Sequence, residues 1–143
     1  MTYYLSLGAN LGEREQTLRR ALEQIEQHIG PVRSCSSFYY SAPWGFRSEH
    51  GFCNLCCAVE SDKSPVEVLD ITQAIEKALG RTKKTERANL TAPVYSDRTI
   101  DIDIIRVFER DKELSVTTER LTIPHPLWQE REFVKIPLAE IMP

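Results

Sequence analysis

The chain has 143 residues with 41% hydrophobic side chains, enough for one core that buries roughly two-thirds of the unfolded surface, so we expect a single domain spanning residues 1–143. A formal net charge of −3 argues against a general nucleic-acid-binding protein, because such proteins carry a basic excess. Residues 1–4 lack the features of a signal peptide, and no apolar run reaches membrane-spanning length. We therefore expect no nucleic-acid partner, no membrane partner and a cytoplasmic location.

The first half of the chain alternates between strand-like and helix-like patterns. Short apolar runs bounded by glycine or proline predict strands, and apolar residues at helical spacing predict one long helix. In chain order we expect a strand at 3–7, a glycine-containing turn at 8–12, a helix at 13–28, a strand at 32–40, a loop at 43–51 and a strand at 52–60.

The second half begins with strong helix signals. Ser64 is an N-cap residue, Pro65 occupies the first helical position, Glu67 completes a capping box, and Gly80 is a C-terminal stop. The following segment, 81–97, has almost no periodicity, which is typical of a functional loop. Beyond it we expect a strand at 99–108, a turn at 111–112, a returning strand at 114–117 and a tail with one or two short helices.

Four cysteines raise the question of a metal site, because Cys53 and Cys56 have a zinc-like spacing. No second pair of Cys or His lies at a matching distance, however. In a strand, Cys53 and Cys57 share one face and Cys56 takes the other. We therefore expect buried, reduced thiols and no zinc.

The segment Arg98 to Ile105 places two carboxylates two residues apart in a strand of β-branched residues. Asp101 and Asp103 should share one face while the isoleucines between them point into a core. At a separation of about 6.6 Å and an effective dielectric constant near 20, their repulsion is about 2–3 kcal/mol, and divalent cations would reverse it. Hard oxygen ligands favour Mg²⁺ bound together with substrate phosphates. The alternative is a solvated strand face with two unrelated acids.

A cationic segment leads to these aspartates. It contains Arg81, Lys83, Lys84, Arg87 and Arg98, opposed only by Glu86 and Asp97. Such a segment could clamp phosphates next to the metal, or it could be a solvated basic loop.

The order of the expected elements favours an α+β fold. Two helices between antiparallel or mixed strands in the order βαββαβ indicate a ferredoxin-like sheet with helices packed on it. Fold alone names no reaction.

An ordered set of motifs resembles the 6-hydroxymethyl-7,8-dihydropterin pyrophosphokinase family over nearly the whole chain. The matching blocks are LGANLG at 7–12, SSFY at 36–39, PWG at 43–45, FCN at 52–54, IE at 75–76, GR at 80–81, RTIDIDI at 98–104, RLTIPHP at 120–126 and REF at 131–133. The resemblance implies an enzyme of folate biosynthesis that transfers the terminal pyrophosphate of ATP to the pterin hydroxymethyl oxygen and releases AMP. It also implies a ferredoxin-like core with three catalytic loops.

The resemblance assigns a catalytic role to five side chains. Asp101 and Asp103 would hold two Mg²⁺ ions on the triphosphate, and Arg98 and His125 would neutralise charge on the leaving AMP. Arg81 would close over the site together with Lys83. Such chemistry requires mainly alignment and charge neutralisation.

The resemblance also implies two binding sites, with ATP and 6-hydroxymethyl-7,8-dihydropterin as substrates and no obligate protein partner. The ATP site would consist of Leu69, Gln73, Glu76, Lys83, Tyr95, Arg98, Ile104, Arg120, Thr122, His125 and Arg131. The pterin site would consist of Gly8, Ala42, Pro43, Trp44, Phe52, Asn54 and Phe133. A flat heterocycle suits aromatic faces and an amide that offers a donor and an acceptor. Tyr95 stands where the family often has a loop tryptophan.

Three alternatives share part of this pattern. A polymerase-type nucleotidyltransferase would also use paired aspartates, but it should show a glycine-serine turn before them and a third carboxylate strand after them. A non-catalytic ferredoxin-like domain could bind ATP without consuming it. A pterin enzyme that does not use ATP would need neither the paired aspartates nor the basic segment.

Overall fold

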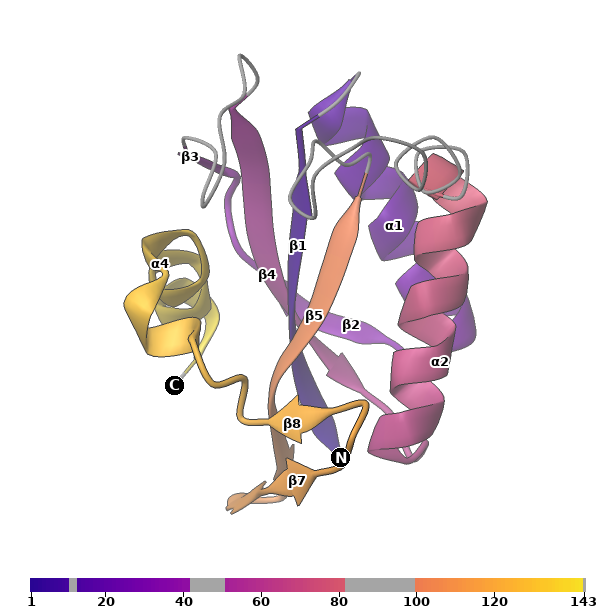
Figure 1. Ribbon diagram of the computed structural model, residues 1–143, viewed down its shortest axis with the longest axis vertical. Helices are drawn as coiled ribbons and strands as arrows, with labels where there is room; N and C mark the ends of the chain where they lie inside the picture. The colour runs from indigo at the N-terminus through magenta and orange to yellow at the C-terminus, as the bar shows by residue number, and fades with distance from the viewer. Residues whose placement is uncertain (11–12, 42–50, 82–99, 143) are drawn as a thin grey trace.

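A six-stranded sheet forms the centre of the molecule, with helices on both faces (Figure 1). The computed structural model describes residues 1–10, 13–41, 51–81 and 100–142. Its strands are β1 (Thr2–Ala9), β2 (Val32–Cys35), β3 (Tyr39–Ser41), β4 (Phe52–Glu60), β5 (Asp101–Glu109) and β6 (Lys112–Leu114), and a separate two-stranded sheet pairs β7 (Val116–Thr117) with β8 (Thr122–Ile123). The helical elements are α1 (Arg14–His28), α2 (Pro65–Glu76), η1 (Lys77–Arg81), η2 (Trp128–Glu130) and α4 (Glu132–Ile141).

Strand β1 lies in the middle of the sheet. It pairs antiparallel with β4 on one side and with β5 on the other along most of its length. The strand order is β2-β4-β1-β5-β6, and β3 adds to β4 beyond the end of β2. Every strand pair is antiparallel, so the chain has the predicted α+β class with a wholly antiparallel main sheet.

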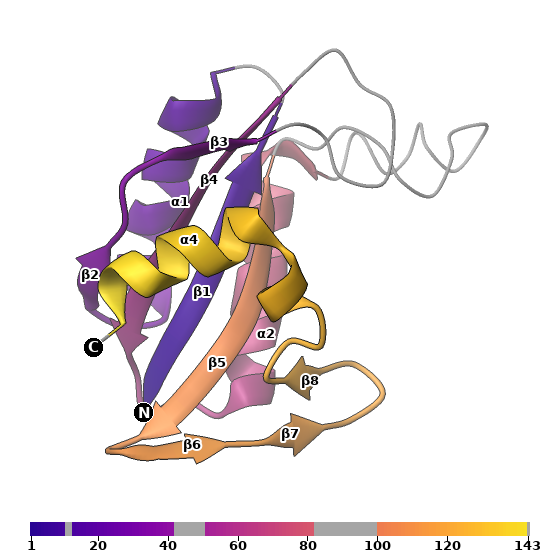
Figure 2. The same cartoon turned by 90° about the vertical axis from the view of Figure 1, so that its left-hand side faces the viewer.

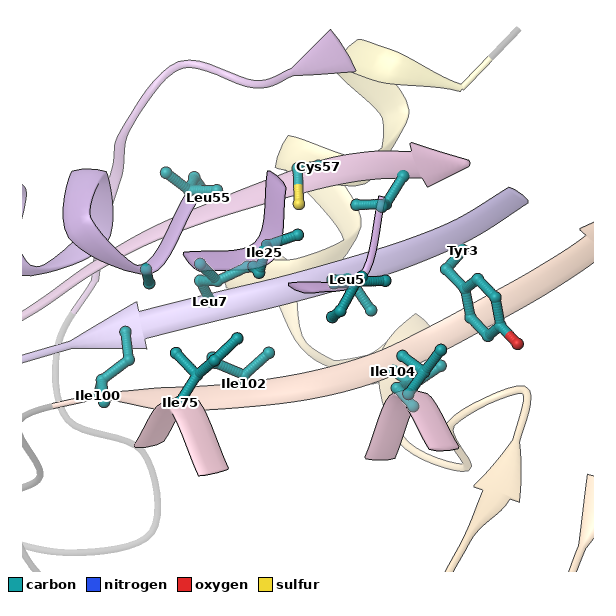
Figure 3. Packing of buried hydrophobic residues seen from close by; sticks show 14 of the residues in the cluster. Tyr3, Leu5, Leu7, Ile25, Leu55, Cys57, Ile75, Ile100, Ile102 and Ile104 are labelled. Carbon is teal, nitrogen blue, oxygen red and sulfur yellow. The ribbon is translucent and has the colours of Figure 1, made fainter. Parts of the chain in front are cut away.

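The two faces of the sheet carry separate cores. Helices α1 and α2 cover one face, and α4 crosses the other (Figures 1 and 2). On the α1/α2 face, Leu5 and Leu7 of β1 pack with isoleucines of α1, α2 and β5 (Figure 3). On the α4 face, Tyr4, Cys56 and Ile105 pack with residues of α4. Alternate residues of β1 therefore serve different cores, as the period of a strand requires.

A β-bulge in β5 adjusts this alternation. Leu5 pairs with Ile104, but the preceding Tyr4 pairs with Arg106, which leaves Ile105 as an extra residue. Ile104 lies in the core beneath α1 and α2, whereas Ile105 lies in the core beneath α4. The bulge is local, so the alternation at Asp101 and Asp103 is undisturbed.

The cysteines lie where the strand period predicts them. Cys53 and Cys57 belong to the core beneath α1 and α2, whereas Cys56 belongs to the core beneath α4. All three are buried free thiols, and burial raises the pKa of Cys56 to about 12. The predicted burial is confirmed for these three residues, whereas Cys35 is exposed. Their reduced state stays a prediction.

Helix α2 begins with the predicted capping box. The Ser64 hydroxyl accepts a hydrogen bond from the Glu67 backbone N–H at 3.3 Å, and the Ser64 N–H donates to the Glu67 carboxylate at 3.1 Å. Gly80 interrupts the helical geometry inside η1 with a φ of 110°, a conformation that glycine adopts without strain.

The predicted strand at 32–40 is wrong in one respect, because it divides into β2 and β3. The Ser36 hydroxyl accepts the Cys56 N–H at 2.9 Å, in place of a carbonyl of the ladder. Ser37 binds Glu140 of α4 instead of a strand, donating from its hydroxyl at 2.8 Å and from its N–H at 3.0 Å. Side-chain hydrogen bonds from distant elements thus interrupt the strand.

The segment after β5 also differs in detail from the prediction. The turn lies at Arg110 and Asp111, one residue earlier than expected, with Arg110 at a φ of 56°. The predicted returning strand at 114–117 consists of two pieces, since β6 pairs with β5 whereas β7 pairs with β8. Across the described ranges, no helix is long and apolar enough to cross a membrane.

The capping box makes a stability prediction. Replacing Ser64 by Ala leaves the Glu67 N–H without its cap, so we expect the free energy of unfolding to fall by about 1 kcal/mol and Tm to fall by roughly 2–4 °C. Urea and thermal unfolding measure both quantities. Ser115→Ala, at an exposed position outside any helix, is the matched control and should leave them unchanged. Equal stability of the two variants would contradict the role of the cap.

Candidate active site

One end of the sheet brings residues from three strands into a single row. Gly8 of β1 pairs with Asn54 of β4 on one side and with Asp101 of β5 on the other. The C-terminal end of β1 and the N-terminal ends of β4 and β5 lie together there (Figure 1). Paired residues share a face, and this face is the one that carries α4. We call Asn54, Gly8 and Asp101 the central row.

Gly8 allows a close approach in the central row. A Cβ atom at this position would lie 2.9 Å from Asn54 Oδ1 and 3.7 Å from Phe52 Cδ1. The first of these distances is a clash, so any larger residue would displace the amide. The missing side chain thus lets the Asn54 amide lie against the backbone of β1.

The Asn54 side chain has a fixed orientation. It is 2% exposed, and its Nδ2 donates to the Tyr39 carbonyl at 3.0 Å and to Ser41 Oγ at 2.9 Å. An amide nitrogen has only two protons, so both are used inside the protein. The structure therefore leaves only the acceptor Oδ1 for a ligand, whereas the sequence interpretation expected the amide to offer a donor as well.

Asp101 and Asp103 share one face of β5, as predicted. Both are half-buried, and Ile100, Ile102 and Ile104 point into the opposite core. Among the described residues, no group of three or more His, Cys, Asp or Glu side chains could hold a metal by itself. The protein contributes two carboxylates, and other ligands must come from water or substrate. This donor set fits Mg²⁺, which usually takes one or two carboxylates together with phosphates.

Glu76 of α2 supports the strand between the two aspartates. It is 4% exposed, and its Oε2 accepts a hydrogen bond from the Ile102 N–H at 2.8 Å. Strand β6 pairs with β5 only at Val107–Glu109, so Ile102 lies on an outer edge of the sheet. A buried carboxylate takes the place of a neighbouring strand there.

His125 binds the same edge of β5. Its backbone N–H donates to the Ile105 carbonyl at 2.9 Å, and its ring Nδ1 accepts from the Leu127 backbone N–H at 3.1 Å. In the neutral ring the proton is therefore on Nε2. Burial lowers the pKa of His125 below its usual value, Arg131 lowers it further, and Asp101 acts in the opposite direction. The ring is a neutral Nε2–H donor close to the charges of Arg131 and Asp101.

The start of α4 adds a cation and an aromatic ring on the same face. The Arg131 guanidinium carbon lies 5.7 Å from the centre of the Phe133 ring, a cation–π contact. Phe133 packs partly against the core beneath α4. The chain from β8 to α4 thus carries His125, Arg131 and Phe133 on one short segment.

The α2 side brings together part of the predicted ATP site. Arg120 Nη2 donates to Asp70 at 2.7 Å and to Gln73 at 3.1 Å, which ties the β7–β8 connection to α2. This ion pair is half-exposed and contributes little stability. Leu69 packs against the core from the same helix, and Thr122 is exposed on β8. The side chain of Ile104 is buried in the core. A ligand at the edge of β5 would therefore contact the backbone of Ile104 and not its side chain.

Some predicted site residues fall outside the described ranges. They are Ala42, Pro43, Trp44, Lys83, Tyr95 and Arg98, together with the side chain of Arg81. Sequence reasoning also missed two groups, the Tyr39 carbonyl and the Ser41 hydroxyl, which orient Asn54. The only available signal was that a buried Asn on a strand needs partners for its amide protons.

Paired carboxylates, a neutral histidine donor and an arginine on the edge of an antiparallel sheet fit the class of metal-dependent phosphotransferases. The model of the 7,8-dihydro-6-hydroxymethylpterin-pyrophosphokinase (HPPK) family matches residues 4–143, and the chain belongs to this family. It is a pyrophosphokinase of folate biosynthesis, which transfers a pyrophosphoryl group to hydroxymethyldihydropterin.

Curated relatives agree with the family assignment. A 2-amino-4-hydroxy-6-hydroxymethyldihydropteridine pyrophosphokinase of Porphyromonas gingivalis is 44% identical over 140 residues, covering 98% of this chain and 90% of the relative. The Bacillus subtilis protein of the same name is 38% identical, covering 96% of this chain and 76% of the relative. A crystal structure of an HPPK-DHPS in complex with substrates has the same fold, with a TM-score of 0.70 and 15% identity over 99% of this chain and 42% of that chain.

The environment of His125 makes a pH prediction. Because its pKa is lower in the folded than in the unfolded protein, where it is about 6.5, the folded state resists protonation. The stability that depends on the neutral ring is complete above pH 6.5 and is lost as the pH falls through the lowered pKa. We expect His125→Asn, whose side-chain oxygen can still accept the Leu127 N–H, to lose less stability than the parent protein between pH 6.5 and 5.

Two measurements check this. Urea unfolding at several pH values gives the stability difference, and NMR titration of the ring gives the pKa. Arg131→Gln should raise the His125 pKa by removing a repulsive charge, whereas Lys112→Gln, at an exposed position on β6, should not change it. A His125 pKa at or above 6.5 in the parent protein would refute the prediction.

Proposed function

We propose that pyrophosphoryl transfer from ATP to 6-hydroxymethyl-7,8-dihydropterin takes place over the central row. The observation that carries this proposal is the register of three strands, which sets a buried amide, a glycine and a carboxylate side by side. A flat ring over Gly8 would have its polar edge toward Asn54, and its hydroxymethyl group could extend toward Asp101.

The pterin would lie between Asn54 and the aromatic side chains on this face. Phe52 contacts the Gly8 position and Phe133 starts α4, so both can supply apolar ring contacts. Family resemblance adds Ala42, Pro43 and Trp44 to this pocket. The pterin ring has hydrogen-bonding groups at its edge and apolar area on its faces. The combination of polar and aromatic residues suits both.

Asp101 and Asp103 would hold two Mg²⁺ ions. Bound metal would neutralise phosphate charge and orient the reacting oxygens. The support is the donor set: two half-buried carboxylates on one face with remaining coordination positions for phosphate and water. Glu76 would keep the two aspartates in register by holding the Ile102 N–H.

ATP would lie along the outer edge of β5 toward α2. Leu69 offers an apolar contact, Gln73 and Arg120 offer polar groups already close to each other, and the β5 edge offers backbone groups. The residues assigned to this site by resemblance are Leu69, Gln73, Glu76, Lys83, Tyr95, Arg98, Ile104, Arg120, Thr122, His125 and Arg131.

His125 and Arg131 would stabilise the charge that develops on the leaving AMP, together with Arg81 and Arg98 from the basic segment. The lowered pKa of His125 keeps its ring neutral near pH 7, so it would act through its Nε2–H. Arg131 adds a permanent positive charge next to this donor.

We also propose that the chain is a ferredoxin-like domain with three functional loops that acts without an obligate protein partner. Supporting the fold is the strand order β2-β4-β1-β5 with α1 and α2 on one face. The chain covers 90% of the Porphyromonas relative but only 19% of the Dictyostelium discoideum folic acid synthesis protein FOL1, which is 34% identical over the matched region. The same kind of domain therefore occurs in chains of very different length.

Product analysis tests the proposal. The protein is mixed with Mg-ATP and 6-hydroxymethyl-7,8-dihydropterin, and nucleotides and pterins are separated by chromatography. We expect AMP and pterin diphosphate in equal amounts, with no ADP. Asp101→Asn and Asp103→Asn should each lower kcat by at least about 100-fold because a charged metal ligand is lost, while pterin binding remains.

Asp111→Asn is the matched control, because Asp111 is an exposed carboxylate in the β5–β6 turn. It should keep the parent activity. Full activity of both central variants would exclude the metal assignment. Tight ATP binding without turnover in the parent protein would indicate a non-catalytic nucleotide-binding domain instead.

A further inference from the structure

We propose that Arg106 is a positioning residue for the transfer reaction. Its guanidinium contacts Trp128 and thereby anchors the turn that carries His125 and Arg131 to the edge of β5. Neither Arg106 nor Trp128 is among the site residues assigned by resemblance. The roles of His125 and Arg131 in charge stabilisation rest on the proposed function, but the anchoring of the turn does not.

The bulge in β5 turns Arg106 toward the face that carries α4. Tyr4 lies in the core beneath α4 and pairs with Arg106, and paired residues share a face. Ile105 lies in the same core, although neighbouring residues of a regular strand point to opposite faces. The extra residue of the bulge makes this possible. Arg106 therefore lies on the same face as Asp101 and Asp103.

Four side chains from three parts of the chain hold the guanidinium of Arg106. Its Nε and Nη2 donate to Glu113 of β6 at 2.8 and 2.9 Å, which is a bidentate ion pair. Its Nη1 donates to Met142 Sδ at 3.3 Å, just beyond the end of α4. The guanidinium carbon lies 4.9 Å from the centre of the Phe108 ring and 5.2 Å from the centre of the Trp128 ring. A planar, forked cation can make all of these contacts at once.

The turn between β8 and α4 is attached to β5 at two consecutive residues. The His125 backbone N–H donates to the carbonyl of Ile105 at 2.9 Å, and Arg106 contacts Trp128 three residues further along the turn. Within the turn, the Trp128 N–H donates to the His125 carbonyl at 3.3 Å, and the Arg131 N–H donates to the Trp128 carbonyl at 3.4 Å. Both distances are long for backbone hydrogen bonds. The turn therefore depends on its attachments to β5 to keep its shape.

The contribution of Arg106 is one of position. Its charge is paired with Glu113, and the hydrogen bonds from Arg106 hold the pKa of this carboxyl below its usual value, so the carboxylate is ionised at neutral pH. Groups that stabilise a developing charge must already stand where that charge appears. A displaced turn would move His125 and Arg131 from that place while leaving the pterin contacts on β4 intact.

Substitutions at both ends of the anchor test the inference in the full chain. Arg106→Met removes the guanidinium but keeps an unbranched apolar stem. Trp128→Leu removes the aromatic ring, and Trp128→Phe keeps one. The matched control is Arg33→Met, at an exposed position on β2, the strand at the opposite edge of the sheet. Steady-state kinetics are measured with Mg-ATP and 6-hydroxymethyl-7,8-dihydropterin.

We expect Arg106→Met and Trp128→Leu each to lower kcat by about tenfold and to raise the ATP KM by about fivefold, because they displace groups that contact ATP. The pterin KM should stay within about twofold, since the pterin contacts are retained. The double variant should lose no more than either single variant, because both remove the same contact. Trp128→Phe and Arg33→Met should keep the parent values.

These kinetics separate positioning from a purely structural role. A smaller amount of folded enzyme lowers the apparent kcat and leaves both KM values unchanged. That result in Arg106→Met would overturn the inference, as would parent-like kinetics or additive losses in the double variant.

Hydrogen exchange in the ligand-free protein tests the anchor without the reaction. The His125 backbone N–H should exchange at least about tenfold faster in Arg106→Met than in the parent protein, and by a larger factor than the backbone amides of the central strand β1. Acceleration at His125 that does not exceed that of β1 would overturn the inference even if the enzyme is active. The expected exchange in a parent protein that forms no AMP would refute the proposed function alone.

Discussion

The antiparallel pairing of β1 with β4 and β5 is the interaction on which the rest of the structure depends. It brings strands together that are distant in the chain, and its register decides which residues become neighbours. Because successive side chains of β1 point to opposite faces, one strand supplies Leu5 and Leu7 to the core beneath α1 and α2 and leaves Gly8 on the α4 face. A shift of the register by one residue would bury Asp101 and expose Ile102.

The outer edge of β5 is the second constraint. Strand β6 covers only its far end, so the backbone groups near the aspartates need other partners. Glu76 accepts the Ile102 N–H, and the His125 backbone donates to the Ile105 carbonyl. Two residues assigned to the site therefore also complete the sheet. Substitution of Glu76 would be expected to affect stability and site geometry together, which makes it a poor probe of chemistry alone.

Much of the local structure could be predicted from short-range patterns. The alternation of Asp101 and Asp103 with isoleucines, the division of Cys53, Cys56 and Cys57 between two faces, and the capping box at Ser64 were all confirmed. Each depends on residues within a few positions of one another, where the periods of strands and helices apply. The strand predicted at 32–40 failed because its interruption depends on Cys56 and Glu140, which are distant in sequence.

The sequence by itself determined the elements, the α+β class and the identity of the paired carboxylates, because these depend on local periodicity and on residue chemistry. Family resemblance assigned site residues whose roles remain proposals. Only the tertiary structure decided that Gly8 separates Asn54 from Asp101, that the Asn54 amide offers only its oxygen, and that burial beside Arg131 keeps His125 neutral. These properties depend on strand register, on hydrogen bonds between separate elements and on desolvation, none of which a local sequence pattern contains.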